Sequence, residues 1–371
     1  DQFTGRAVAN WTPKLDFTDQ TLIYGSYSHG YKAGGANPPG AMLLIYGGGT
    51  TETEISNPVH PLTFKPEFID AFELGTKNTL LDGALTLNGN AFYYNYENYQ
   101  ISEIVDRTSI NLNFDAHVKG AELEATWEPV PGLRFNFGGG YEDTRLAKGD
   151  HAVDLMDRTA GNSDWIVVKP FITQASNCIV PSYVVAYQLQ YTSYSISGDC
   201  GNAYISHLDP VTGAPYGTSQ TNTHGDPIIP GTYDGFDPLT APNNGAGFDK
   251  DLGGNELPNA PHFTVSAGAQ YTVPLTSDWA GTLRSDFYWQ DASWARVFND
   301  DPYDRIHGYT NLNLTLIFTS QNGWQVMLYD KNVFNTTAIT GTFLNSDDTG
   351  LTTNVFLTDP KLIGVRITKN W

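Results

Sequence analysis

Apolar and polar residues alternate with a period of two through run after run of this chain. The clearest run spans residues 310–318, where Leu312, Leu314 and Leu316 share one side and Asn311 and Asn313 the other. Successive side chains of a β-strand point to opposite faces, so the pattern predicts strands with one apolar face. A helical membrane span would need about 18 consecutive apolar residues, and the sequence contains no such stretch.

Connections between the predicted strands are alternately short and long. Short turns fall near residues 13–19, 81–83, 129–132, 274–278 and 321–323, and long inserts near 33–65, 102–113, 147–258, 297–306 and 335–360. A transmembrane β-barrel produces this order because its periplasmic turns are tight and its extracellular loops are long. A soluble β-sandwich does not require it. The pattern therefore favours an all-β transmembrane antiparallel barrel with long extracellular loops.

The runs predict about eleven strands. They begin near Phe3, Gln20, Glu67, Ala84, Val118, Leu133, Pro261, Gly281, Tyr309, Trp324 and Lys361. Single-chain bacterial barrels have even strand numbers, and an odd number would leave the two chain ends on opposite sides of the membrane. We therefore expect residues 1–371 to form part of a larger barrel.

The composition excludes two classes. Forty Asp and Glu against 20 Lys and Arg give a formal charge of -20, so the chain lacks the basic footprint of a nucleic-acid-binding protein. Aromatic residues make up 13 %, which is too many for a disordered, solvated coil.

Several segments resemble the barrel strands of TonB-dependent outer-membrane receptors. They match in family order: residues 3–7 leading into 22–35, then 64–77, 120–124, 251–261, 330–335 and 364–367. The resemblance implies a 22-strand barrel plugged by an N-terminal domain that follows a short TonB-contacting segment. Neither the plug nor that segment is recognised in this chain, which is expected to supply about the last eleven strands. Trp371 stands where the family usually ends in Phe and is expected to act as the barrel-assembly signal.

The resemblance also implies a function. The family takes up scarce ligands such as siderophores, cobalamin or oligosaccharides across the outer membrane of Gram-negative bacteria. Expected partners are outer-membrane lipid, an extracellular ligand, and the TonB complex through the missing N-terminal part. No cofactor and no enzymatic activity are expected, because the sequence holds no nucleophile elbow, P-loop or CxxC motif.

The long insert at 147–258 carries the candidate ligand residues. Tyr183, Tyr187, Tyr191 and Tyr194 are three or four residues apart, yet the intervening Val184, Val185 and Thr192 favour a strand or hairpin over a helix. Tyrosines of this kind could line a ligand site, and the alternative is a self-packed hairpin. His207 and His224 are further candidates for ligand contact, as is His151, although a lone loop histidine is usually only solvated.

The two cysteines, Cys178 and Cys200, are expected to pair if the protein lies in the cell envelope, and otherwise to be free thiols. Pairing would close a loop of about twenty residues and stabilise the fold by about 3 kcal/mol.

Two acidic clusters raise the question of a metal site. Asp249, Asp251, Gly254 and Glu256 hint at a calcium loop, but their spacing fits an EF-hand poorly and a strand entry better. Asp300, Asp301 and Asp304 are interpreted as a solvated loop tip. We expect no metal site.

Two other functions stay open at this point. A passive porin-type channel would need an even strand number and no plug. A secreted β-sandwich binding module would need two packed sheets.

Overall fold

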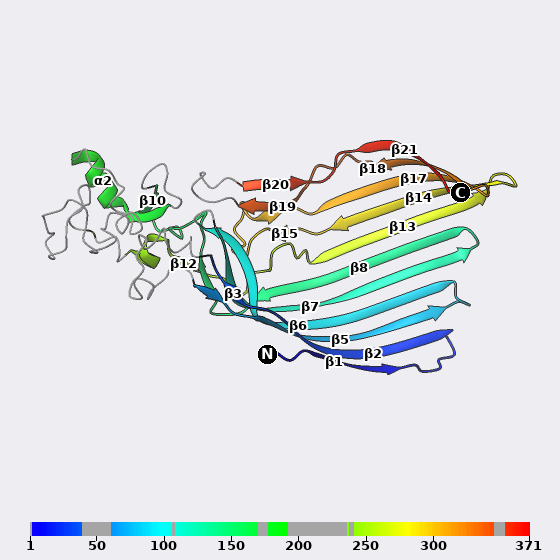
Figure 1. Cartoon of the computed structure of the whole chain (residues 1–371), viewed down its shortest axis with the longest axis horizontal. Helices are drawn as coiled ribbons and strands as arrows, with labels where there is room; N and C mark the ends of the chain where they lie inside the picture. Colours follow the sequence, from blue (N-terminus) through cyan, green and yellow to red (C-terminus); the bar gives the residue numbers. More distant parts are fainter. Residues whose placement is uncertain are drawn as a thin grey trace.

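A computed structural model describes residues 2–38, 61–105, 108–169, 177–191, 236, 241–344 and 353–371. Its dominant feature is one antiparallel sheet in which each long strand pairs with the next in chain order (Figure 1). The eleven strands are β1 (Gly5–Trp11), β2 (Gln20–Lys32), β5 (Glu67–Leu80), β6 (Leu85–Val105), β7 (Thr108–Val130), β8 (Leu133–Leu146), β13 (Phe263–Pro274), β14 (Trp279–Gln290), β17 (Tyr309–Ser320), β18 (Trp324–Lys331) and β21 (Leu362–Lys369). The predicted eleven-strand all-β fold is confirmed, and the long strands form one sheet rather than the two packed sheets of a sandwich.

The long inserts gather at one end of the sheet and the short turns at the other (Figure 1). Within the inserts lie five two-stranded ribbons: β3 (Gly35–Ala36) with β4 (Thr63–Phe64), β9 (His151–Val153) with β12 (Asp249–Asp251), β10 (Trp165–Val168) with β11 (Cys178–Pro181), β15 (Ser293–Trp294) with β16 (Arg305–Ile306), and β19 (Ile339–Leu344) with β20 (Thr353–Leu357). A short α-helix, α2 (Ser182–Tyr191), and a 3₁₀ turn, η3 (Pro242–Gly245), complete the described elements. No helix in the described part of the chain has the length and hydropathy needed to cross a membrane.

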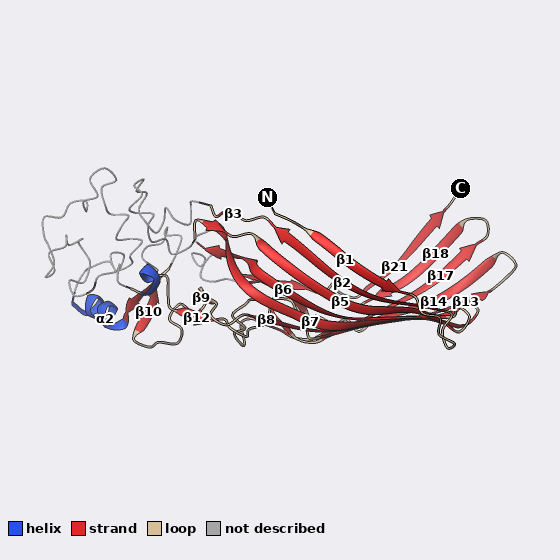
Figure 2. Cartoon of the chain, turned by 90° about the horizontal axis from the view of Figure 1, so that it is seen from below, coloured by secondary structure: helices blue, strands red, loops and turns tan. Residues whose placement is uncertain are grey.

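The sheet bends into an open trough (Figure 2). β1 and β21 are its outermost strands. Within the described residues, each of them pairs with a long strand on one side and has no strand on the other. Each therefore presents a row of backbone donors and acceptors on its other side.

The register gives the sheet one apolar and one polar face. Leu123 on β7 lies opposite Gly89 and Gly139, whereas its neighbour Glu122 lies opposite Asn90 and Gly140. The apolar face exposes Phe72, Leu74, Leu123, Phe137, Leu283, Leu328 and Val365, among others. The polar face carries Asn88, Asn90, Glu122, Glu124, Arg134, Asn136, Gln270, Arg284, Asp286, Asn311 and Asn313.

Charges appear on the apolar face where the strands approach the inserts. Lys119, on the same side of β7 as Leu123, pairs with Asp143 at 3.2 Å, and Asp143 pairs with Arg145 at 2.9 Å. An uncharged apolar band that ends in ion pairs is the pattern of a strand leaving hydrocarbon for water.

A β-bulge changes the direction of β6 at this level. Tyr96 pairs with Ala116 and Tyr99 with Phe114, so β6 holds one residue more than β7 at this point. Asn98 takes a positive φ of 56°, and its amide donates to the Asp115 carboxylate at 2.8 Å. Before the bulge, the even-numbered residues of β6 lie on the polar face of the sheet. After residue 98, the extra residue brings the odd-numbered residues to that face instead.

Beyond the bulge the two strands continue as a hairpin. β6 and β7 contain 21 and 23 residues, about twice the length that crosses a bilayer. The expectation of a loop insert at 102–113 is therefore wrong, because these residues remain paired from Ser102 opposite Asn111 to Val105 opposite Thr108.

A small apolar core closes the insert end of the polar face. Phe114, Ala116 and Val118 of β7 pack with Leu252, Leu257 and Phe298 from two inserts. Side-chain amides fasten these inserts together. Asn255 donates to the Val297 carbonyl at 2.9 Å, and Asn299 accepts from the Glu256 amide at 2.7 Å. The inserts are thus packed onto the sheet over its polar face.

Candidate functional site

The tyrosines predicted to contact a ligand lie on a helix. Tyr183 and Tyr187 belong to α2 and are 58 % and 45 % exposed, whereas Val184 and Val185 are buried against Cys178 and Val180 of the neighbouring ribbon. The expectation of a strand or hairpin is wrong here because burial of this valine pair against β10 and β11 outweighs the weak β-propensity of β-branched residues. Tyr191 ends α2.

Tyr194, His207, His224 and Cys200 lie outside the described residues. Cys178 is buried and disulfide-bonded, and its pairing with Cys200 stays a prediction. The barrel-assembly role of Trp371, which follows β21 and is fully exposed, also stays a prediction.

The calcium-like segment has structural roles. Asp249 and Asp251 belong to β12, where Asp251 pairs with His151 of β9. The Glu256 carboxylate accepts from Arg145 at 3.0 Å and lies 3.0 Å from the His262 ring. Within the described part of the chain, no group of three or more His, Cys, Asp or Glu side chains is arranged to hold a metal ion.

Aromatic rings and carboxylates share the polar face just below the inserts. Phe92 and Tyr94 stack with centroids 4.8 Å apart, and Tyr96 meets Tyr99 edge to face at 5.2 Å. Around these rings lie the carboxylates of Glu67, Glu73, Glu122 and Glu142, close enough to interact electrostatically with the tyrosines. We call this surface the Tyr–Glu wall.

Two glycines let the rings of this wall lie flat on the sheet. A Cβ atom at Gly75 would come within 2.6 Å of the Tyr24 ring, and one at Gly120 within 2.6 Å of the Phe92 ring. The Tyr24 hydroxyl donates to the Glu73 carboxylate from this position. Tyrosine offers a ligand an apolar ring and a polar tip, so the wall suits ligands with both kinds of surface.

A buried ion-pair network joins two inserts above the wall. Arg296 donates to Asp154 and to Asp304, each at 2.6 Å, and both carboxylates are almost fully buried. Lys250 extends the network to Asp300 at 2.7 Å and to Asp157 at 2.9 Å. The interpretation of the 300–304 segment as a solvated loop tip is therefore wrong for Asp304.

The charges of the network reinforce one another. Although burial alone would raise the pKa of Asp154, the hydrogen bonds and positive charge of Arg296 hold it below its usual range. Burial lowers the pKa values of Arg296 and Lys250. The neighbouring carboxylates raise them by more, so the net shift is upward for both. Both cations thus stay charged, and the network holds the 147–258 and 297–306 inserts together.

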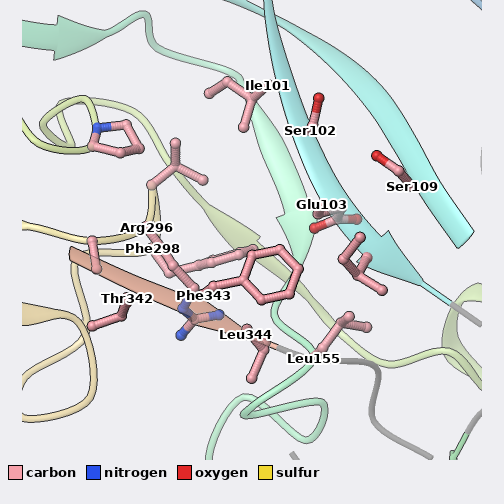
Figure 3. A pocket seen from close by; sticks show the side chains of 14 residues that line it. Ile101, Ser102, Glu103, Ser109, Leu155, Arg296, Phe298, Thr342, Phe343 and Leu344 are labelled. Atoms are coloured by element: carbon pink, nitrogen blue, oxygen red, sulfur yellow. The ribbon is translucent and has the colours of Figure 1, made fainter. Parts of the chain in front are cut away.

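Beside this network lies a cavity of about 220 Å³, which we call the four-insert pocket (Figure 3). Its walls come from the β6–β7 hairpin, the 147–258 insert, the 290–306 connection and β19. Most of its lining is apolar: Ile101, Ile104, Leu155, Pro258, Val297, Phe298, Phe343 and Leu344. Polar groups are few and include Glu103, Ser109 and Arg296.

Glu103 brings a carboxyl group into this apolar setting. Burial raises its pKa, Arg158 and Arg296 lower it, Asp154 raises it, and the net pKa is about 7. Glu103 points into the pocket because the bulge at residues 96–99 brings the odd-numbered positions of β6 to the side of the inserts. A carboxyl group that titrates near neutral pH in a cavity marks a candidate functional site.

Neither the pocket nor the network was predicted from the sequence. Arg296 and Asp154 are separated by 142 residues, so no local pattern connects them. A usable signal was the presence of an acidic residue, Glu103, among Ile101, Ile104 and Val105 at the start of the segment predicted to be a loop insert.

Replacing Arg296 with Met should open the insert cluster. The substitution leaves the buried Asp154 and Asp304 carboxylates without their main partner, which costs about 3–5 kcal/mol when a buried pair is broken. Hydrogen exchange of backbone amides in the segments around 151–157 and 295–306 should accelerate accordingly. The matched control is R305M, which removes a guanidinium stacked 4.6 Å over Trp294 and should cost about 1 kcal/mol or less. Equal effects of the two substitutions would contradict the importance of the network.

The stability of the same cluster should depend on pH through Glu103. Its pKa of about 7 lies above the ordinary value of 4.5, so between these pH values the native state keeps a proton that the opened state has lost. The free energy of opening should therefore fall as the pH rises from about 5 to 7, and level off above 7. Hydrogen exchange corrected for intrinsic rates measures this. The E103Q variant should show a flat profile over this range, and a profile unchanged from wild type would refute the assignment.

Comparison with known proteins places the sheet in a family. The family model described as "TonB dependent receptor-like, beta-barrel" matches residues 1–335. No curated protein sequence matches the chain.

Two solved structures share the fold. The ferric yersiniabactin uptake receptor FyuA from Yersinia pestis superposes with a TM-score of 0.53 at 15 % identity, over 98 % of this chain and 36 % of that protein. The siderophore receptor PiuA from Acinetobacter baumannii superposes with a TM-score of 0.51 at 14 % identity, over 96 % of this chain and 34 % of that protein. The chain thus spans about a third of the length of these structures. Because the family model covers most of the sequence and the eleven-strand sheet superposes on these receptors, the chain belongs to the TonB-dependent receptor-like β-barrel family.

Proposed function

We propose that this chain supplies the C-terminal barrel strands and the outer loops of an outer-membrane receptor that takes up a scarce ligand with energy from the TonB complex. The observation that carries the proposal is the family match together with the packing of the inserts over the polar face at one end of the sheet. This arrangement supports a ligand-binding mouth above a lumen in a Gram-negative outer membrane.

The open edges of the sheet support a larger barrel. A membrane-spanning sheet must pair every backbone donor and acceptor, and strands β1 and β21 each have an unpaired side among the described residues. The structural neighbours are about three times as long as this chain. We infer that further strands, a plug and a TonB-contacting segment complete the receptor.

The residues of the chain, rather than the neighbours, support a proposal for the ligand class. FyuA and PiuA are receptors for ferric yersiniabactin and a siderophore, but identities of 14–15 % relate the fold alone. The Tyr–Glu wall presents rings and carboxylates beneath the mouth. Such a surface suits a ligand with apolar and hydroxyl-rich parts, such as cobalamin, an oligosaccharide or a siderophore of low negative charge.

The outer part of the 147–258 insert can be removed to test this function. In the full-length receptor, a short Gly-Ser linker would replace residues 163–244, which include α2, β10 and β11, and would keep Asp154, Asp157 and Lys250. Cells that carry this variant should lose TonB-dependent accumulation of the labelled ligand that the wild-type receptor imports, selected from ferric siderophores, cobalamin and oligosaccharides.

Two controls make the result interpretable. The variant should keep its heat-dependent gel mobility, since the eleven strands are untouched. A tonB deletion should abolish uptake by the wild type. Undiminished uptake by the linker variant would refute the role of the insert, and wild-type uptake that does not need TonB would refute the proposed function.

A further inference from the structure

We propose that the four-insert pocket binds a ring-sized apolar group that carries a protonated amine, with the ammonium against the Glu103 carboxylate. The inference rests on the proposed function only in that the ligand arrives from outside the cell. It deepens that function by naming the chemical class that the mouth selects.

The size and lining of the pocket set the apolar part of the ligand. A dry cavity of about 150 Å³ is known to accept benzene, so 220 Å³ accommodates one ring with a short side chain. Phe298 and Phe343 lie on one side of the cavity, and Leu155 and Leu344 lie at its lower end (Figure 3). Dispersion contacts with these walls favour a ring over a flexible polar chain.

The charges around Glu103 set the sign of the polar part. From the 147–258 insert, Arg158 and Asp154 face the carboxyl group, and Arg296 faces it from the 290–306 connection. Asp304 and Lys250 lie behind these groups, bonded to Arg296 and Asp154.

Of the charged side chains, Glu103 and Arg296 line the pocket itself, whereas Asp154, Asp157, Asp300, Asp304 and Lys250 belong to the network beside it. Arg158 and Arg296 stabilise the ionised Glu103 carboxylate electrostatically, and Asp154 opposes them. An anionic group would meet ionised Glu103 without a free counter-charge from Arg296, which Asp154 and Asp304 already engage. An ammonium group would bond to the desolvated carboxylate, where charge-assisted hydrogen bonds are strong.

Binding of an amine should therefore be linked to the loss of the Glu103 proton. The carboxyl group has a pKa of about 7, so the ionised fraction rises about tenfold between pH 6 and pH 8. The affinity for an amine should rise with pH by up to that factor, whereas the affinity for an uncharged ring should not.

Three probes with one ring and different charges test the proposal: 2-phenylethylamine, 2-phenylethanol and phenylacetate. Binding to the detergent-solubilised full-length receptor is measured by saturation-transfer NMR at pH 6 and pH 8. We expect the amine to bind tightest, the alcohol more weakly and the acid weakest. The E103Q variant should bind the amine and the alcohol about equally and show no pH dependence, whereas E97Q, on an exposed residue of the same strand, should behave as wild type.

A third variant separates the cavity from the charge. Thr342 lines the pocket on the same side of β19 as Leu344, which packs against Ile110 and Leu155, so T342F should fill the cavity and weaken all three probes. Equal binding of alcohol and amine by the wild type, an amine affinity unchanged in E103Q, or failure of the wild type to bind any probe would each overturn the proposal. Because probe binding needs neither TonB nor energy, amine binding without ligand uptake would reject the transport function alone, and uptake without amine binding would reject this inference alone.

Discussion

Backbone pairing across eleven strands is the constraint on which the rest of this structure depends. Inside a bilayer every amide and carbonyl must find a partner within the protein, and a continuous antiparallel ladder meets this demand at minimal cost. The ladder also determines where side chains point. In β7, Leu123 faces the apolar side because Glu122 and Glu124 face the other. The apolar band, the polar wall and the end at which the inserts lie therefore have one common cause.

The single irregularity that matters for the site is the bulge at residues 96–99. Without it, the alternation of β6 would turn Glu103 and Ile101 away from the inserts and bring Ser102 and Ile104 toward them. With it, Tyr99, Ile101 and Glu103 continue the inner face that begins with Phe92 and Tyr94. The pocket forms where this redirected hairpin meets the inserts held by Arg296, so an acidic group lies among apolar side chains at the insert end of the sheet.

Much of the fold could be predicted from the sequence because its main signal is local. Strand starts at Gln20, Glu67, Leu133, Tyr309 and Trp324 match the structure, since alternation and turn residues are read within a few positions. β7 is the largest exception. It begins at Thr108 rather than near Val118. Its outer half has its apolar residues on even positions such as Ile110 and Phe114, which pack against inserts distant in sequence, whereas the inner half has them on odd positions.

The candidate site could be predicted far less well. The helix of Tyr183 and Tyr187 depends on a valine contact with β11, and Arg296 meets Asp154 across 142 residues. Contacts of this kind are tertiary, so neither periodicity nor spacing reports them.

Depth-resolved spin labelling of β7 tests the central claim most directly. Labels placed one at a time at residues 121–127 of the full-length receptor in bilayers report collision with oxygen in lipid and with a nickel chelate in water. The structure predicts that odd positions contact lipid, with the greatest depth near Leu123, and that even positions such as Glu122 and Glu124 do not. Uniform accessibility along the strand, or lipid contact at the even positions, would contradict the assignment of the two faces and with it the location of the mouth.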